Sequence, residues 1–303
     1  MLPRVVVLMS TFNGEKFLRE QLDSVLRQIN VEIKINIRDD GSSDGTQNIL
    51  EEYSKNNHNI SFKVGKNIGA AQSFLTLLYQ IDWSKSYDYL AFCDQDDLWD
   101  EKKINMAVEK IKRVSTPALY YSALNTFNNI TLEKEKINVP YQYTLIESMF
   151  KSVFPGCTMV INRAGIEMLY QIGKPSAVVM HDCFIYQVFI AAGYSIFYDT
   201  NSYINYRIHG SNYSILKKNI SSWYKHMRKI AYDQKGLRLE AAKELYRLSH
   251  QFATEKAIEI FRNFAEYNCN FKKKRMVLRY LKDTRFSRMI KVEFLVAFLF
   301  DIY

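Results

Sequence analysis

Short apolar runs alternate with helical periodicity along the first two hundred residues. Residues 5–9 read VVVLM, an uninterrupted run typical of a strand buried in a parallel sheet, and residues 15–28 then place apolar side chains at helical spacing. Further strands are expected at 33–37, 60–64, 89–93, 119–122, 157–161 and 196–198, and further helices at 47–53, 70–79, 102–113 and 182–192. This order predicts an α/β protein with a mainly parallel central sheet that helices flank on both faces.

The pattern changes near residues 212–218. Strand-like alternation ends there, and the remainder of the chain contains no proline and reads as helices. We therefore expect an α/β domain over residues 1–215 and a helical C-terminal region over residues 216–303.

The basic charge of the protein belongs to this C-terminal region. Residues 216–303 hold 20 Lys and Arg against 9 acidic residues, whereas residues 1–215 hold 21 against 23. Basic side chains recur every three or four positions at 275, 279, 282, 285, 288 and 291, and residues 294–300 read FLVAFLF. Such a segment can lie on an anionic membrane surface, or it can be a solvated face beside a core-packing helix; both interpretations stay open. A nucleic-acid function ranks last because no recognised nucleic-acid module accompanies the charge.

Composition narrows the class of protein. The 303 residues are 48% hydrophobic and 24% charged, which excludes a disordered or fibrous protein. The four cysteines form no CxxC pair, so neither a zinc site nor a disulfide framework is expected and a reducing cytoplasm is favoured. No run of ~18 apolar residues occurs, so we expect no membrane-spanning segment.

Acidic clusters follow several of the predicted strands. They are Asp39 with Asp40, the DQDD sequence at 94–97, and Asp182 after His181. Carboxylates gathered at strand ends repel one another unless a cation or a ligand offsets the charge. Asp94 and Asp96, two residues apart, project to one side of an extended segment and can reach one hard divalent ion. A DxD sequence alone is common, and a solvated acidic turn is the alternative.

Four motifs occur in an order that is hard to produce by chance. STFNGE at 10–15, RDDGSSDGT at 38–46, NIG at 67–69 and FCDQDDLW at 92–99 resemble the signatures of family 2 glycosyltransferases of the GT-A fold. GCTMV at 156–160, HD at 181–182 and YRIHGSN at 206–212 resemble the bacterial rhamnosyltransferase-like branch that builds surface polysaccharide. The resemblance covers roughly residues 3–215, and the tail matches only in its helical, basic character.

The resemblance implies roles for residues of the nucleotide-sugar site. The nucleoside pocket would be lined by Thr11, Phe12, Asn13 and Glu15, with Asp39 or Asp40 accepting a hydrogen bond from a pyrimidine. Asp94 would face the ribose or the metal, and Asp96 would hold Mn²⁺ or Mg²⁺ beneath the diphosphate. Asn67 and Gly69 are equally well explained by a tight turn or by contact with the nucleotide. AAQS at 70–73 departs from relatives, which often carry a basic residue there.

The same resemblance supplies candidates for catalysis. Asp182 is expected to be the general base, a role compatible with capping the following helix. His181 is expected to lie at the acceptor pocket and to orient Asp182. Arg207 would bind the diphosphate and His209 would complete the metal shell. Trp99 is expected either to wall the acceptor pocket or to pack in the core.

The expected activity is therefore metal-dependent, inverting transfer of a sugar from a nucleoside diphosphate to a lipid-linked glycan at the inner face of the cell membrane. Rhamnose from dTDP-rhamnose is the favoured donor, and a UDP-linked galactose, glucose or N-acetylhexosamine is the alternative. A non-catalytic nucleotide- or carbohydrate-binding scaffold is the alternative from another class. A nucleotidyltransferase is excluded because STFNG at 10–14 stands where a Gly-rich, Arg-containing loop would be required.

Overall fold

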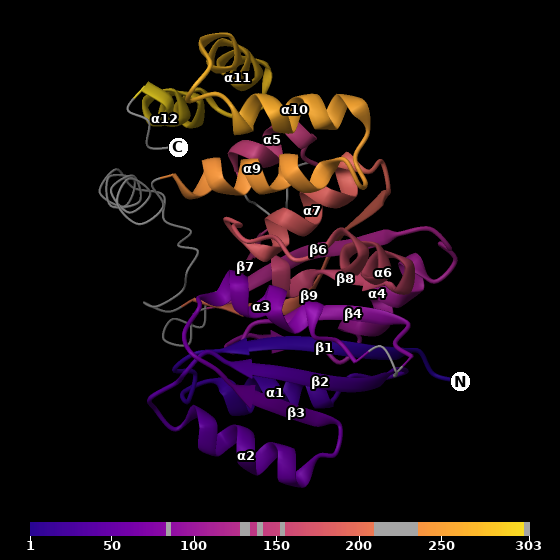
Figure 1. Cartoon of the computed structure of the whole chain (residues 1–303). Helices are drawn as coiled ribbons and strands as arrows, with labels where there is room; N and C mark the ends of the chain where they lie inside the picture. Colours follow the sequence, from indigo (N-terminus) through magenta and orange to yellow (C-terminus); the bar gives the residue numbers. More distant parts are fainter. Residues whose placement is uncertain (83–85, 128–133, 138–141, 152–154, 209–235, 300–303) are drawn as a thin grey trace. The chain divides into compact units, whose positions relative to one another are not determined.

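The computed structural model describes residues 1–82, 86–127, 134–137, 142–151, 155–208 and 236–299 (Figure 1). The chain forms two compact units. The sheet unit comprises residues 1–142, 154–174 and 194–209, and the helical unit comprises residues 143–153, 175–193 and 210–303. The helical unit therefore takes in two segments that lie before the boundary expected near residue 215.

The sheet unit is built on strands in the order β3-β2-β1-β4-β8-β6-β9-β5, with β7 paired to β6. The first four are parallel: β3 (Ile60–Val64), β2 (Glu32–Asp39), β1 (Arg4–Thr11) and β4 (Tyr89–Cys93). The others are β8 (Val160–Asn162), β6 (Ala118–Phe127), β9 (Ser195–Arg207), β5 (Leu98–Trp99) and β7 (Lys134–Ile137). β6 and β9 pair in parallel, whereas β8, β5 and β7 pair antiparallel, so the sheet predicted to be mainly parallel is mixed. β7 follows β6 too closely for the crossover that a parallel pair requires.

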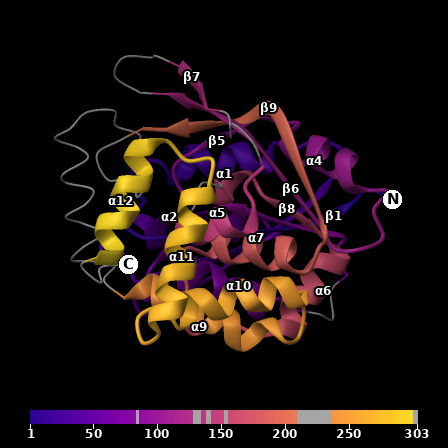
Figure 2. The same cartoon turned by 90° about the horizontal axis from the view of Figure 1, so that it is seen from above.

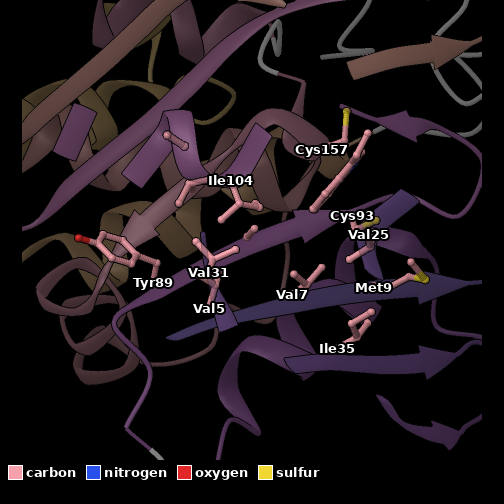
Figure 3. Packing of buried hydrophobic residues seen from close by; sticks show 14 of the residues in the cluster. Val5, Val7, Met9, Val25, Val31, Ile35, Tyr89, Cys93, Ile104 and Cys157 are labelled. Carbon is pink, nitrogen blue, oxygen red and sulfur yellow. The ribbon is translucent and has the colours of Figure 1, made fainter. Parts of the chain in front are cut away.

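Helices cover this sheet because its strands are apolar on both faces. Val5, Val7 and Met9 of β1 pack with Val25 on one face, as Figure 3 shows. On the other face Phe74 of α3 meets Phe92 of β4 edge-on, with ring centroids 5.8 Å apart. The flanking helices are α1 (Leu18–Leu26), α2 (Thr46–Asn56), α3 (Ala70–Tyr79), α4 (Lys103–Ile111) and α6 (Arg163–Ile172), and a 3₁₀ turn (Gly156–Thr158) precedes β8.

The strands that matter for function all point the same way. β1, β2, β3 and β4 are parallel, and β8 reverses direction between β4 and β6, so β6 and its parallel partner β9 share the direction of β4. The carboxyl ends of β1, β2, β4 and β9 therefore meet at one edge of the sheet, where ligands bind in folds of this kind.

The helical unit has an aromatic core. Phe150 contacts the rings of Phe264, Phe294 and Phe298, with centroids 5.1, 5.4 and 6.0 Å away. These aromatic side chains are thus internal to the helical unit. The helices are α5 (Leu145–Phe150), α7 (His181–Ala191), α9 (Leu237–Ser249), α10 (Glu255–Ala265), α11 (Phe271–Asp283) and α12 (Arg288–Leu299), of which α11 and α12 run side by side (Figure 2).

Glu147 joins two parts of the helical unit. Its carboxylate completes a capping box with Thr144 at the start of α5 and also accepts from the backbone N–H and the guanidinium of Arg285. Arg285, one of the periodic basic residues of the tail, thereby fixes the turn between α11 and α12. None of the helices in the described ranges combines the length and the apolar character needed to cross a bilayer.

Candidate active site

Two loops at the carboxyl ends of β1 and β2 are tied together by their own polar groups. Asn13 N donates to Ser42 Oγ (2.9 Å), and Asn13 Oδ1 accepts from Ser43 N (2.9 Å). Glu15 accepts from Gly45 N through Oε2 at 2.9 Å. Asn13 and Glu15, both predicted from the sequence to line a nucleoside pocket, therefore lie together at this edge and also hold the edge in shape.

The DQDD loop after β4 is attached to the same edge. The Gln95 side-chain amide accepts from Phe12 N (2.8 Å) and donates to Phe12 O (3.0 Å), so both polar groups of that residue's backbone are satisfied by one side chain. A Cβ at Gly14 would collide with the Gln95 amide, so a larger residue there would displace this side chain from the Phe12 backbone. The Phe12 ring itself is 45% exposed and stands free on this edge.

Asp39 is fully buried and accepts hydrogen bonds from four donors. Thr11 Oγ1 (3.0 Å) and the Ser42 hydroxyl donate to Oδ2, and Ser42 N (2.9 Å) and Gln47 Nε2 (3.3 Å) donate to Oδ1. These contacts fill the acceptor capacity of a carboxylate. A base that bonded to Asp39 would have to replace one of these donors, and the Gln47 contact is the longest.

Asp40 organises a different turn. It pairs with Arg38 and accepts from the backbone N–H groups of Ile68 (2.9 Å) and Gly69 (2.8 Å). Gly69 has φ of +79°, which side chains other than glycine rarely adopt. Asn67 Oδ1 accepts from the same Gly69 N–H (3.2 Å). The NIG segment is thus a built turn at the sheet edge, next to the loop after β2.

Arg207 holds the end of β9 against the DQDD loop. Its Nε donates to the Asp96 carbonyl (2.8 Å), and its Nη2 donates to Glu20 Oε2 (2.8 Å). The guanidinium carbon lies 4.5 Å from the Phe17 ring centroid and 4.7 Å from that of Phe127. The residue is only 2% exposed. Its position favours support of the loop over the direct contact with a diphosphate that the sequence suggested.

Behind the DQDD loop lie two buried ionisable side chains that were not among the predicted site residues, Asp97 and Lys103. Among the described residues, neither Asp97 Oδ2 nor Lys103 Nζ has a hydrogen-bond partner, although both side chains are buried. Asp97 Oδ1 accepts from Arg207 N (3.2 Å), and Lys103 Nζ lies 3.5 Å from the Trp99 ring centroid. Burial and then the charges of Asp94 and Asp96 raise the pKa of Asp97 well above its usual range. Burial lowers the pKa of Lys103 to about 8.

Three potential metal ligands converge on this loop. One ligand atom each of Asp94, Asp97 and Cys157 lies within 4.8 Å of the others. Asp94 and the unpartnered Asp97 oxygen offer carboxylate oxygens that suit a hard divalent ion, and Asp96 adds a third carboxylate to the same loop. The Cys157 thiol is a softer donor, and burial raises its pKa well above the ordinary value. The residues therefore fit a divalent cation through their carboxylates.

The remaining predicted residues belong to other segments of the chain. Trp99 is 5% exposed in the core of the sheet unit, so it packs internally and does not wall an acceptor pocket. His181 and Asp182 are buried in the first turn of α7, in the helical unit, where Asp182 Oδ1 accepts from Cys183 N (2.6 Å). Burial lowers the pKa of His181 to about 3, which keeps the imidazole neutral. His209 lies outside the described residues.

The sheet edge thus brings together most of the predicted nucleotide-side residues. They are Thr11, Phe12, Asn13, Glu15, Asp39, Asp40, Asn67, Gly69, Asp94, Asp96 and Arg207. Gln95, Asp97 and Lys103 were not among the predicted site residues. The tight succession of acids in DQDD was the available signal for Asp97, whereas Lys103 reads as an ordinary exposed helix residue beside Lys102.

Comparison with known proteins gives consistent results. A sequence model described as glycosyl transferase family 2 matches residues 6–167. The dTDP-rhamnosyl transferase RfbG of Shigella flexneri is 33% identical over 215 residues, which cover 67% of this chain and 72% of that protein.

Two solved structures share the architecture. The S. aureus TarS fragment in complex with UDP-GlcNAc superposes with a TM-score of 0.53 at 17% identity, covering 92% of this chain and 80% of that one. The mannosyltransferase PcManGT from Pyrobaculum calidifontis, in complex with GDP-Man and Mn²⁺, gives a TM-score of 0.53 at 15% identity, covering 100% of this chain and 81% of that one. These likenesses concern the fold, and they confirm the predicted GT-A arrangement.

Proposed function

Because the chain belongs to glycosyl transferase family 2, we propose that it transfers rhamnose from dTDP-rhamnose to a hydroxyl of a lipid-linked glycan in bacterial surface polysaccharide synthesis. The support for this donor is the 33% identity to a dTDP-rhamnosyl transferase. A UDP-hexose stays the alternative donor, because uridine and deoxythymidine present the same pyrimidine edge. Because the proposed acceptor is linked to a lipid, the enzyme would work at the inner face of the cell membrane.

The observation that carries the proposal is the interlocked edge formed by the loops after β1, β2 and β4. It gathers a free aromatic ring at Phe12, buried carboxylates at 39 and 40, and the half-buried carboxylates of Asp94 and Asp96. We infer that the pyrimidine packs near Phe12 and bonds to Asp39 in place of Gln47 Nε2. Asn13, Glu15, Asn67 and Gly69 would shape the pocket mainly through the loop contacts that they make.

A divalent cation, Mn²⁺ or Mg²⁺, would be held by Asp96 with Asp94, and His209 would complete the shell. When bound, the ion neutralises the charge that builds on the diphosphate leaving group. The chain's own contribution is to hold the two carboxylates where the β4 strand ends. Arg207 supports this by fixing the Asp96 carbonyl, and Asp97 by accepting from the Arg207 backbone.

Asp182 is the proposed general base. A carboxylate that accepts the proton of the acceptor hydroxyl, in a single displacement at the anomeric carbon, inverts the configuration of the sugar. Its first-turn position on α7 also places its negative charge at the positive end of the helix. His181, neutral because it is buried, would orient this turn and not exchange protons in the reaction.

A panel of nucleotide sugars tests the proposal. Wild-type protein with Mn²⁺ or Mg²⁺ is expected to hydrolyse and transfer from one pyrimidine-linked sugar, dTDP-rhamnose, and Asp96→Ala is expected to abolish the metal-stimulated rate with the fold intact by circular dichroism. Turnover of wild type that persists in chelator would contradict the metal assignment. Undiminished function of Asp182→Asn would favour the non-catalytic scaffold.

A further inference from the structure

The helical unit presents an exposed stripe of positive charge on α11. Lys272, Arg275, Arg279 and Lys282 are spaced by three, four and three residues, so they share one side of the helix, and all four are exposed. None of them forms an ion pair with an acidic side chain in the described part of the chain. The opposite side of α11 buries Val277 and Leu281. The stripe is therefore solvated and carries four uncompensated charges.

The neighbouring helix α12 presents exposed apolar side chains where a surface helix would normally be polar. Met289 is 67% exposed, Val292 50%, and Leu295 and Val296 are also exposed. Their spacing of three to four residues places them along one side of the helix. Ala297 and Phe298 on the other side are buried, and Phe298 joins the aromatic cluster around Phe150. One apolar side of α12 therefore packs in the helical unit, and a second apolar side is exposed to solvent.

The two stripes belong to one surface. Only residues 284–287 separate the helices, which run side by side in Figure 2, and Lys291 Nζ on α12 donates to the Lys282 carbonyl at the end of α11 (2.7 Å). Tyr280 of α11 stacks on Phe264 and Phe298 of α12 contacts Phe150, so both helices pack on the same aromatic core and their exposed sides face outward from it. Phe271, 82% exposed at the start of α11, adds an aromatic ring to this surface.

We propose that this α11–α12 surface docks on an anionic lipid bilayer. Basic side chains next to exposed apolar ones match phosphate headgroups next to acyl chains, and an aromatic ring is favoured in the interface between them. Arg285 has no part in the surface because Glu147 holds it. The inference goes beyond the transfer reaction, and its test needs no sugar donor.

The test is co-sedimentation of the full chain with vesicles of phosphatidylcholine alone or with added phosphatidylglycerol. The variant Lys272→Gln, Arg275→Gln, Arg279→Gln, Lys282→Gln removes four charges, each worth about a fivefold change in binding. We expect it to lose at least a hundredfold in affinity for the anionic vesicles. The matched control removes four exposed charges of the same unit on α9 and α10: Lys243→Gln, Arg247→Gln, Lys256→Gln and Arg262→Gln.

The control variant is expected to bind anionic vesicles almost as wild type does. Equal losses in the two variants would show a response to net charge alone and overturn the proposal, as would wild-type binding that is absent or independent of phosphatidylglycerol. A second measurement addresses insertion of the surface into the bilayer. In the variant Phe271→Trp, brominated lipid is expected to quench the fluorescence of the introduced tryptophan. The double variant Val292→Ser, Leu295→Ser is expected to bind the anionic vesicles more weakly than wild type. Absence of that quenching would overturn docking on a bilayer and would indicate that the surface binds a protein partner. Rates on a soluble acceptor, measured in parallel, separate this outcome from failure of the transferase.

Discussion

Lys103 offers a sharp test of the electrostatics behind the DQDD loop. It is a buried ammonium whose Nζ has no hydrogen-bond partner among the described residues, and burial lowers its pKa from 10.5 to about 8. A shift of this size corresponds to about 3 kcal/mol of unfavourable free energy for keeping the charge inside the protein near neutral pH. The substitution Lys103→Met keeps an unbranched side chain of similar length and removes the charge. We therefore expect the variant to equal or exceed wild type in stability at pH 7, by up to about 3 kcal/mol.

The sign of the pH dependence follows from the two pKa values. Below pH 8 Lys103 is charged in both the folded and the unfolded protein, so the penalty is fully present. Between pH 8 and pH 10.5 the unfolded chain binds more protons at this site, so the stability of wild type rises with pH, by about 2 kcal/mol between pH 7 and pH 9.5. Lys103→Met lacks this gain, so its advantage should shrink by the same amount.

The assay is urea unfolding of both proteins at pH 7 and pH 9.5, followed by tryptophan fluorescence because Trp99 underlies the ammonium group. Burial raises the pKa of Cys93 and of Cys157, which lowers stability at alkaline pH, but this contribution largely cancels in the difference between the two proteins. Lys102→Met, on the exposed neighbour, is the control and should match wild type at both pH values. An equal difference between Lys103→Met and wild type at pH 7 and pH 9.5 would refute the reasoning.

Further predictions concern the site and the helical unit. Arg207→Lys loses the bond to the Asp96 carbonyl and should weaken Mn²⁺ binding about tenfold by calorimetry; unchanged affinity would exclude the positioning role. Asp182→Asn should lower turnover by about 10²–10⁴-fold with donor affinity retained, whereas a parallel loss of donor affinity would indicate a structural role. The bonds of Glu147 with Arg285 and Thr144 overcome its burial and lower its pKa from 4.5 to about 2, so wild type should lose stability as pH falls from 4.5 to 2; Glu147→Gln should show a weaker acid dependence in thermal unfolding, and an identical profile would contradict this.

Much of the fold is predictable because it depends on local pattern. The VVVLM run and the alternation that follows predict the buried strands and their covering helices, and α3 and β4 begin and end where expected. The antiparallel pairing of β8 and β5 was not predictable, because short strands take their partners from distant parts of the chain. The assignment of residues 143–153 and 175–193 to the helical unit likewise depends on packing with helices that come much later in the sequence.

The candidate site was predictable in its location but not in the function of each contact. The motifs identify Asp39 and Asp40. Only the three-dimensional arrangement shows that Asp39 accepts hydrogen bonds from donors of the loops, whereas Asp40 holds the turn at Ile68 and Gly69. Arg207 is expected from the motifs to bind a diphosphate, and Trp99 either to wall the acceptor pocket or to pack in the core; both side chains are buried. Lys103 could not be distinguished from Lys102, because adjacent residues of a helix point about 100° apart and only the packing decides which of the two faces the core.

The clasp of Gln95 on the Phe12 backbone has a consequence for ligand binding. One amide spans the segment that would receive a nucleoside and the segment that would receive an ion, so neither can shift without straining the other. If the nucleoside and the ion each stabilise the hydrogen bonds between Gln95 and Phe12, each must raise the affinity of the other by the same factor. We expect the first to bind weakly alone and both to be retained together until the leaving group departs.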